Sequence, residues 1–124
     1  MQFVVLVGIG GALGAIARYW VNHLAVTHFG SSLVGTVFAN VSGSFVLGFL
    51  VGVLSSSNST WAPETRMFLA VGFLGSYTTF STLTVATVQL LQKGDVTTAA
   101  INLGTSVVLG LMAAIIGLLI GKAL

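Results

Sequence analysis

A run of hydroxyl-bearing residues interrupts a long apolar stretch of the chain. Residues 75–82, with the sequence GSYTTFST, lie inside the uncharged stretch 67–92. Polar groups at membrane depth are costly unless they face protein or a water-filled path. A glycine costs a helix about 1 kcal/mol relative to alanine, and serine and threonine divert backbone hydrogen bonds. The run therefore predicts a helix break whose freed carbonyl and N–H groups could bind ions. The alternative is a helix contact in which each hydroxyl bonds back to its own helix.

Three side chains are candidates for contact with an ion. Asn40 places a carboxamide in the middle of an apolar stretch, where it needs partners, and this predicts a pore or ligand role. The ring edge of Phe80 carries partial positive charge and could complement an anion, although a core phenylalanine is the alternative. Arg18 is either an anchor that reaches the membrane surface or a residue that attracts anions.

No catalytic constellation is visible in the sequence. Glu64 and Asp95 are the only acids, and the chain has no cysteine. Neither acid can form a carboxylate pair or a triad inside the apolar stretches, so we expect no enzyme. The net charge is +2, and four basic residues are too few to form a nucleic-acid-binding surface.

The composition indicates the elements that must position these residues. Of 124 residues, 56% are hydrophobic and 5% are charged, whereas soluble domains carry about 25% charged residues. Four apolar stretches each reach the roughly 17–25 residues that a helix needs to cross a bilayer. We predict an all-α membrane protein with one domain, 1–124, and a break in the third helix. Its four transmembrane helices would span residues 3–24, 33–55, 66–92 and 97–121, with connectors near 23–32, 55–66 and 93–97.

Small and polar residues recur at four-residue spacing within these stretches. Residues four apart lie on one helix face, and small ones let transmembrane backbones approach closely. We therefore expect tight helix contacts along two stripes. They are Thr36, Asn40, Ser44, Gly48 and Gly52 in the second stretch, and Asn102, Ser106, Gly110, Ala114 and Gly117 in the fourth.

The basic residues give little preference for one membrane orientation. With four spans, Arg66 and Lys122 fall on one side, and Arg18 and Lys93 fall on the other. The positive-inside rule has almost no bias to act on. Such a chain could insert both ways and assemble as an antiparallel dimer. A chance balance of few charges is the alternative.

Three motifs together resemble the Fluc (CrcB) fluoride channels. They are residues 10–19 (GGALGAIARY), residues 35–40 (GTVFAN) followed by Gly43 and Gly48, and residues 72–75 (GFLG) leading into 78–82 (TTFST). The resemblance covers essentially the whole chain, including its length and four-span layout. It implies a passive, fluoride-selective exporter in the cell inner (plasma) membrane, built as an antiparallel dual-topology dimer with two pores and one structural Na⁺ at its centre.

The resemblance also implies roles for particular residues. Asn40 would donate a hydrogen bond to fluoride, and Phe80 would offer its ring edge. Backbone carbonyls of Gly75 and Thr78 would bind Na⁺, and Arg18 would lie toward an aqueous vestibule. A hydroxyl track would be formed by Thr36, Ser81, Thr82 and Ser106. The implied partners are fluoride, the lipid bilayer and either a second copy of the chain or a paralogous subunit.

The sequence departs from the family pattern at three positions. Leu83 stands where the family usually has a second phenylalanine, Ala86 where an acid often occurs, and Gly110 where a hydroxyl often occurs. Some members of the family work as heterodimers in which one subunit has lost its pore residues. The three departures therefore favour a heterodimer. The equal number of basic residues on the two sides of the membrane favours a homodimer instead.

Two rival functions remain open at this point. A small multidrug transporter shares four short spans and a weak charge bias, but it depends on an acid in its first helix. A non-transporting assembly subunit would use the glycine stripes for packing alone, and it predicts that Asn40→Leu is harmless.

Overall fold

The computed structural model describes residues 1–56 and 61–124, and the regular structure of these residues is helical. Four helical stretches in this part of the chain are long and apolar enough to cross a membrane. They are α1 (Gln2–Phe29), α2 (Ser32–Ser56), the third span (Pro63–Gln92) and α6 (Val96–Ala123). The predicted all-α architecture with four long apolar helices is confirmed. Residues 57–60 of the predicted connector lie outside the described residues.

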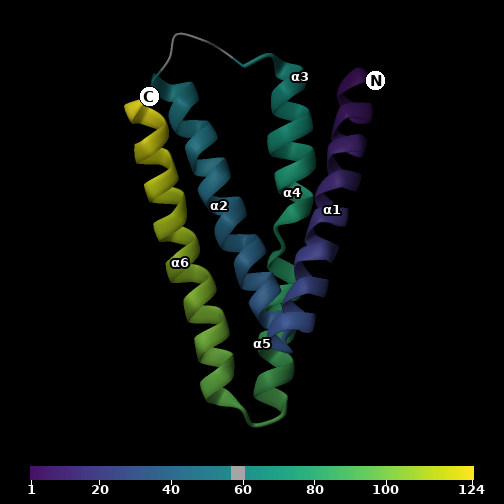
Figure 1. Ribbon diagram of the computed structural model, residues 1–124, viewed down its shortest axis with the longest axis vertical. Coiled ribbons are helices and arrows are strands. Elements are labelled where there is room, and N and C mark those ends of the chain that lie inside the picture. Colours follow the sequence, from purple (N-terminus) through teal and green to yellow (C-terminus); the bar gives the residue numbers. More distant parts are fainter. Residues whose placement is uncertain (57–60) are drawn as a thin grey trace.

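The third span is assembled from four pieces rather than one regular helix. The short α3 (Pro63–Thr65) leads into η1 (Arg66–Leu74), a π-helix, and α4 (Gly75–Tyr77) completes the first half. The second half is α5 (Phe80–Gln92). Between them the backbone of Thr78 (φ −86°, ψ 156°) and Thr79 (φ −151°, ψ 121°) is extended. The coil is visibly interrupted between α4 and α5 (Figure 1).

The predicted break is therefore confirmed, and its position is now defined. Gly75 keeps helical angles (φ −61°, ψ −33°), so the glycine does not itself interrupt the helix. The interruption falls at two threonines, which tolerate extended backbone well because they are β-branched.

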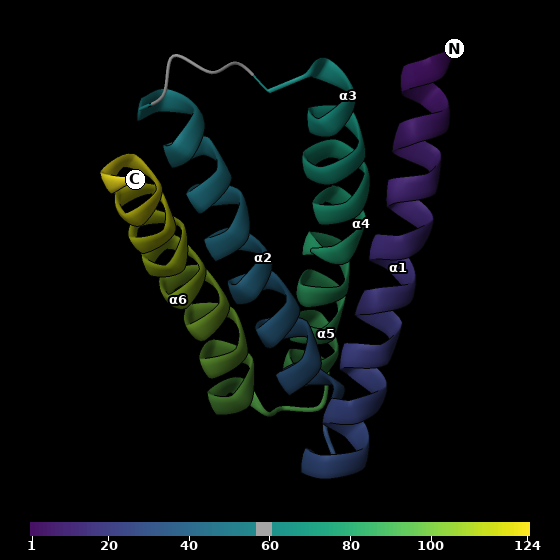
Figure 2. The same cartoon turned by 45° about the horizontal axis from the view of Figure 1, so that its top comes forward.

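The helices are arranged as two close pairs. In Figure 1, α1 runs beside η1 and α4, whereas α2 runs beside α6, and the pairs diverge toward the end that carries both termini. Figure 2 shows the same divergence from a second direction. At the opposite end, Gly94 adopts a left-handed conformation (φ 80°) and turns the chain from α5 into α6.

Glycines bring the backbones of each pair into direct contact. A Cβ on Gly10 or Gly14 would collide with the backbone of η1, at Phe68 and Phe73 respectively. In the other pair, Gly117 meets the Phe45 carbonyl, and Gly48 meets the Ala114 carbonyl. The expected small-residue packing is confirmed between α2 and α6, and Gly10 and Gly14 give the pair of α1 and η1 the same kind of contact.

The first helix is longer than its apolar stretch suggested. It continues to Phe29 and ends at Gly30, which has a left-handed conformation (φ 69°). The Thr27 hydroxyl donates to the His23 carbonyl within this last turn. The polar residues that suggested a connector are accommodated on a helix end, because a helix does not have to stop where its hydrophobic stretch stops.

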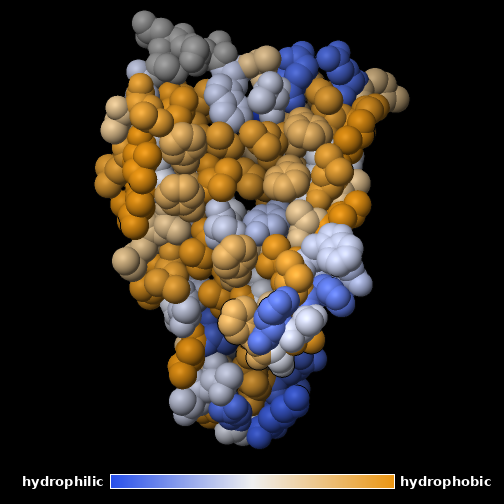
Figure 3. All heavy atoms as spheres, in the orientation of Figure 1, coloured by the Kyte–Doolittle hydropathy of each residue, from blue (hydrophilic) through white to orange (hydrophobic). Residues whose placement is uncertain are grey.

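The outer surface of the bundle is predominantly hydrophobic. Large apolar side chains of all four spans are exposed, and fully buried large side chains are absent from the part of the chain that the structure describes. Figure 3 shows hydrophobic residues over most of one face, with hydrophilic residues gathered toward its two ends. This surface suits a lipid environment or a second subunit.

Candidate ion site at the break of the third span

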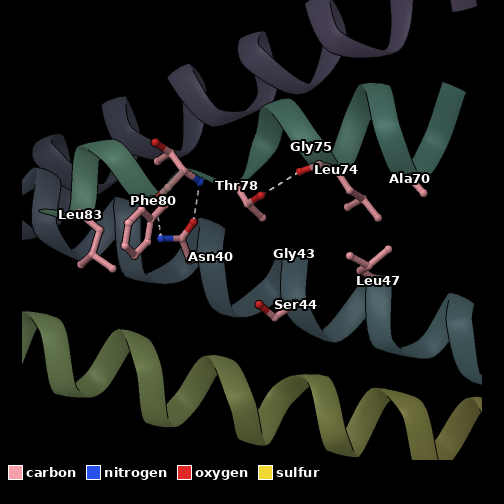
Figure 4. Close-up of a pocket in the computed structure, with 11 residues that line it drawn as sticks. Asn40, Gly43, Ser44, Leu47, Ala70, Leu74, Gly75, Thr78, Phe80 and Leu83 are labelled. Carbon is pink, nitrogen blue, oxygen red and sulfur yellow. Dashed lines mark hydrogen bonds between the residues drawn. The ribbon is translucent and has the colours of Figure 1, made fainter. Parts of the chain in front are cut away.

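Asn40 of α2 is bonded to the break through both ends of its carboxamide. Its Oδ1 accepts from the Thr79 N–H at 2.7 Å, and its Nδ2 donates to the Thr79 carbonyl at 2.9 Å. Figure 4 shows both bonds crossing from α2 to the start of α5. A carboxamide has two N–H donors, so one remains available after this pairing. Asn40 therefore supports the break and keeps a donor for another group.

Thr79 also caps the second half of the span. Its Oγ1 accepts from the Thr82 N–H at 3.3 Å and lies 3.1 Å from the Thr82 hydroxyl. This is the arrangement of an N-cap, in which a side-chain oxygen satisfies an orphan donor of the first turn. Thr79 belongs to the predicted polar run, but its role as a cap gave no signal in the sequence, because the usual capping pattern has Glu or Gln three residues later and Thr82 stands there.

These side-chain bonds leave two backbone carbonyls without their usual helical donors. In a continuous helix, the Thr79 N–H would bond the Gly75 carbonyl, and the Thr82 N–H would bond the Thr78 carbonyl. Both N–H groups go instead to the side chains of Asn40 and Thr79. Gly75 and Thr78, the residues predicted to present carbonyl oxygens, are therefore the ones whose helical donors are diverted.

Arg18 of α1 contacts the same break from the other side. Its Nε donates to the Ser76 carbonyl at 3.1 Å, in a partly buried setting. Ser76 lies at the C-terminal end of the first half-helix, where basic side chains favourably complement unpaired carbonyls. Arg18 was predicted either to reach the membrane surface or to face a vestibule, and the structure adds this direct contact.

A cavity of about 280 Å³ opens beside the break between α2 and the third span. Figure 4 shows the Phe80 ring beside the Asn40 carboxamide at one end of this cavity. The Phe80 side chain is 75% exposed, so it is not a core residue of this chain. Four predicted site residues line the cavity together, and they are Asn40, Gly75, Thr78 and Phe80.

The other predicted pore residues are not brought into this cavity by one chain. Thr36 is buried in α2, and Ser106 is buried in α6, where its hydroxyl donates to the Asn102 carbonyl at 2.7 Å. Ser81 and Thr82 lie exposed on the first turn of α5. Their proposed hydroxyl track remains a prediction.

A second polar contact joins α5 to α6. Asn102 Nδ2 donates to Thr87 Oγ1 at 3.2 Å, and the Thr87 hydroxyl donates to the Leu83 carbonyl at 2.8 Å. The buried Oδ1 of Asn102 has no hydrogen-bond partner. Asn102 belongs to the predicted stripe of the fourth stretch, but its pairing with Thr87 gave no signal in the sequence.

Charged groups are sparse around the site. Groups of three or more His, Cys, Asp or Glu that could hold a metal ion are absent from the described residues. Asp95 caps α6 at the far end of α5, and hydrogen bonds from the Thr98 side chain and N–H hold the pKa of its carboxyl below the ordinary value. Any ion at the break would therefore meet backbone and carboxamide dipoles rather than acidic side chains.

Fold and site together define a multi-pass membrane protein with a partly polar cavity beside a broken third helix. A family model described as CrcB-like protein, Camphor Resistance (CrcB), matches residues 5–118. The chain belongs to this family, as its motifs had suggested.

Several relatives are similar over nearly their full length. A protein of Hydrogenovibrio crunogenus is 42% identical over 96% of this chain and 90% of its own length. One of Dehalococcoides mccartyi strain BAV1 is 40% identical over 100% of this chain and 95% of its own. One of Listeria monocytogenes is 42% identical over 94% and 95%. The first two are named fluoride-specific ion channel FluC, and the third is named fluoride-specific ion channel FluC 1.

Proposed function

We propose that the chain forms a fluoride-selective channel through which F⁻ leaves the cell passively across the cytoplasmic membrane, protecting it from fluoride toxicity. The names of its relatives support a channel, in agreement with the expectation that the chain is not an enzyme. The observation that carries the proposal is the Asn40 carboxamide, which is held at the helix break and lines a cavity beside Phe80.

The chemistry of this site suits a small, strongly hydrated anion. Such an ion needs donors along its path that replace its water, each weak enough to release it. Asn40 offers its second N–H, and Phe80 offers its ring edge. The α5 N-terminus adds backbone N–H groups and the positive end of the helix dipole. In this proposal, Thr36, Ser81, Thr82 and Ser106 continue the path, and Arg18 lies toward an aqueous vestibule.

Sodium would be bound by the released carbonyls of Gly75 and Thr78. Carbonyl oxygens of broken transmembrane helices are suitable ligands for Na⁺, and the diverted donors described above favour their availability. One chain supplies two such carbonyls. A two-fold related partner would supply the same two again, which favours a site at the centre of a dimer.

An antiparallel dimer would also cover part of the exposed apolar surface. Phe80 and the cavity beside it face outward from one chain, so a partner could complete each pore. The partner is a second copy or a paralogue. Leu83, which lines the cavity, replaces the family's second phenylalanine and supports the paralogue, whereas the balanced charges support the second copy.

Reconstitution of the purified chain into fluoride-loaded liposomes tests the proposal. With a potassium ionophore to relieve charge build-up, a fluoride electrode should record rapid efflux, while chloride efflux stays at the level of empty liposomes. Flux that appears only after a paralogous subunit is added would establish the heterodimer. Fluoride efflux no faster than from empty liposomes, with and without a paralogue, would contradict the channel. A small multidrug transporter is disfavoured because α1 carries no acid.

A further inference from the structure

The contact between Arg18 and Ser76 lies at the point where the two halves of the third span separate. In a continuous helix, the Ser76 carbonyl would accept from the N–H of Phe80. Here it accepts from Arg18 Nε at 3.1 Å, and Phe80 begins the second half-helix. Arg18 therefore occupies the acceptor that would otherwise join the two halves.

The packing of α1 fixes the point from which Arg18 reaches this carbonyl. Gly14, one turn earlier on the same face of α1, lies against the backbone of Phe73 with no room for a Cβ. A Cβ on Gly11 would lie 3.1 Å from the Ser76 Oγ. These contacts place the α1 backbone directly against the end of the first half-helix. The Arg18 side chain can therefore reach the Ser76 carbonyl.

We propose that Arg18 is a positioning residue, which keeps the third span open by holding the Ser76 carbonyl away from the Phe80 N–H. Together with Asn40, it holds the break from two directions, because Asn40 binds the Thr79 peptide from α2. The released carbonyls of Gly75 and Thr78 flank the residue that Arg18 holds. This inference rests on the proposed function, since an open break matters for conduction only if ions pass there.

Three substitutions separate this positioning role of Arg18 from a purely electrostatic one. Glutamine places its Nε2 the same number of bonds from the backbone as arginine Nε, so Arg18→Gln keeps a donor and removes the charge. Arg18→Lys keeps the charge but has a methylene at that position. Arg18→Met removes both. Arg66→Lys, at an exposed residue near the start of η1, controls for the arginine-to-lysine change itself.

Fluoride efflux from liposomes is the first readout. We expect Arg18→Gln to conduct about tenfold faster than Arg18→Lys and Arg18→Met, because the partly buried Ser76 carbonyl requires a donor at this position whether or not the donor is charged. Arg66→Lys should conduct like the unmodified protein. Any other order of the three Arg18 variants overturns the proposal, and faster flux through Arg18→Lys than through Arg18→Gln would establish a role through charge.

The second readout follows the contact itself and does not depend on conduction. Of the two tyrosines in the chain, only Tyr77 follows a serine. Labelling serine carbonyls with ¹³C and tyrosine nitrogen with ¹⁵N therefore isolates the Ser76 carbonyl in a solid-state NMR spectrum. Its resonance should move in Arg18→Lys and Arg18→Met and stay near its original position in Arg18→Gln. An unmoved resonance in all three variants would overturn the contact. An unmodified protein without fluoride flux would instead contradict the proposed function and leave this spectroscopic result standing.

Discussion

Asn40 and the backbone of Thr79 are joined by two hydrogen bonds, since the carboxamide accepts from the Thr79 N–H and donates to its carbonyl. A single side chain of α2 thereby takes the place of the helical partners that Thr79 would otherwise have. The unpaired backbone groups of a broken helix are very costly in a membrane. This pairing explains how the third span tolerates a break among polar residues.

Loss of the Thr79 cap should weaken the second half of the span. Thr79→Val removes the oxygen that accepts from the Thr82 N–H, and we expect it to lower the free energy of unfolding by about 1 kcal/mol, the usual size of an N-cap contribution. Thr79→Ser should retain the cap. Unfolding of the purified protein in detergent measures the difference.

Thr84→Val is the matched control for this change. The Thr84 hydroxyl donates only within its own helix, to the Ser81 carbonyl, so its removal should have a much smaller effect on unfolding. Equal destabilisation by Thr79→Val and Thr84→Val would show that the threonine at the break has no special role as a cap.

The contact between α2 and α6 should depend on Gly117. A Cβ there would meet the Phe45 carbonyl, whereas a Cβ at Gly104 of the same helix has nothing within 4 Å. Overpacking a close contact typically costs about 1–3 kcal/mol. We therefore expect Gly117→Ala to lower the unfolding midpoint and Gly104→Ala to leave it unchanged or raise it, since alanine favours a helix. A lower midpoint for Gly104→Ala alone would contradict this packing.

Much of the fold follows from local properties of the sequence. Four apolar stretches and their small-residue stripes predict four spans and the close pairing of helices, because both effects depend on residues near each other in the chain. The polar run 75–82 predicted the break, but not that it falls at Thr78 and Thr79 rather than at Gly75.

The site was less accessible to sequence reasoning, because its bonds link distant residues. Asn40 was identified by the cost of a carboxamide among apolar residues, and Phe80 by its position in the polar run. The partner of Asn40, the contact of Arg18 with Ser76, and the pairing of Asn102 with Thr87 depend on how whole helices are placed. No local pattern specifies these pairings.

Substitutions of Thr87 and Asn102, which are hydrogen-bonded between α5 and α6, should lower the free energy of unfolding by different amounts. Thr87→Val would leave Asn102 Nδ2 without its acceptor, in addition to the already unpaired Oδ1. An unsatisfied buried donor costs about 1–3 kcal/mol. Asn102→Leu removes both buried groups at once, so we expect it to destabilise less than Thr87→Val in the same unfolding assay. The opposite order would indicate that Oδ1 has a partner in the assembled protein.

Asp95 should make the start of α6 sensitive to acid. Its pKa is lowered by hydrogen bonds from Thr98, so its charged form is stabilised in the folded protein. This contribution is fully present above the ordinary aspartate pKa and is lost as the pH falls through the lowered value. Amide exchange at the first turn of α6, after correction for intrinsic rates, should increase over that acidic window.

Asp95→Asn is the control for this pH dependence. It keeps an oxygen that can accept from Thr98 and removes the titration, so exchange at the first turn of α6 should become independent of acid pH. A variant whose exchange still increases as strongly as that of the unmodified protein would assign the acid response to another group.

We expect fluoride to accept a hydrogen bond from the Asn40 carboxamide as it passes the broken helix, and fluoride efflux through Asn40→Leu tests this most directly. Hydrogen bonds to charged groups are worth about 1.5–3 kcal/mol, so efflux should fall by about tenfold or more in liposomes carrying equal amounts of folded protein. The isosteric Asn40→Asp has at most one donor, which the Thr79 carbonyl takes, so none is left for fluoride and efflux should fall likewise. Ser42→Ala, which removes a hydroxyl bonded within α2 and to Tyr77, should conduct normally. Unchanged efflux through Asn40→Leu or Asn40→Asp would contradict the account.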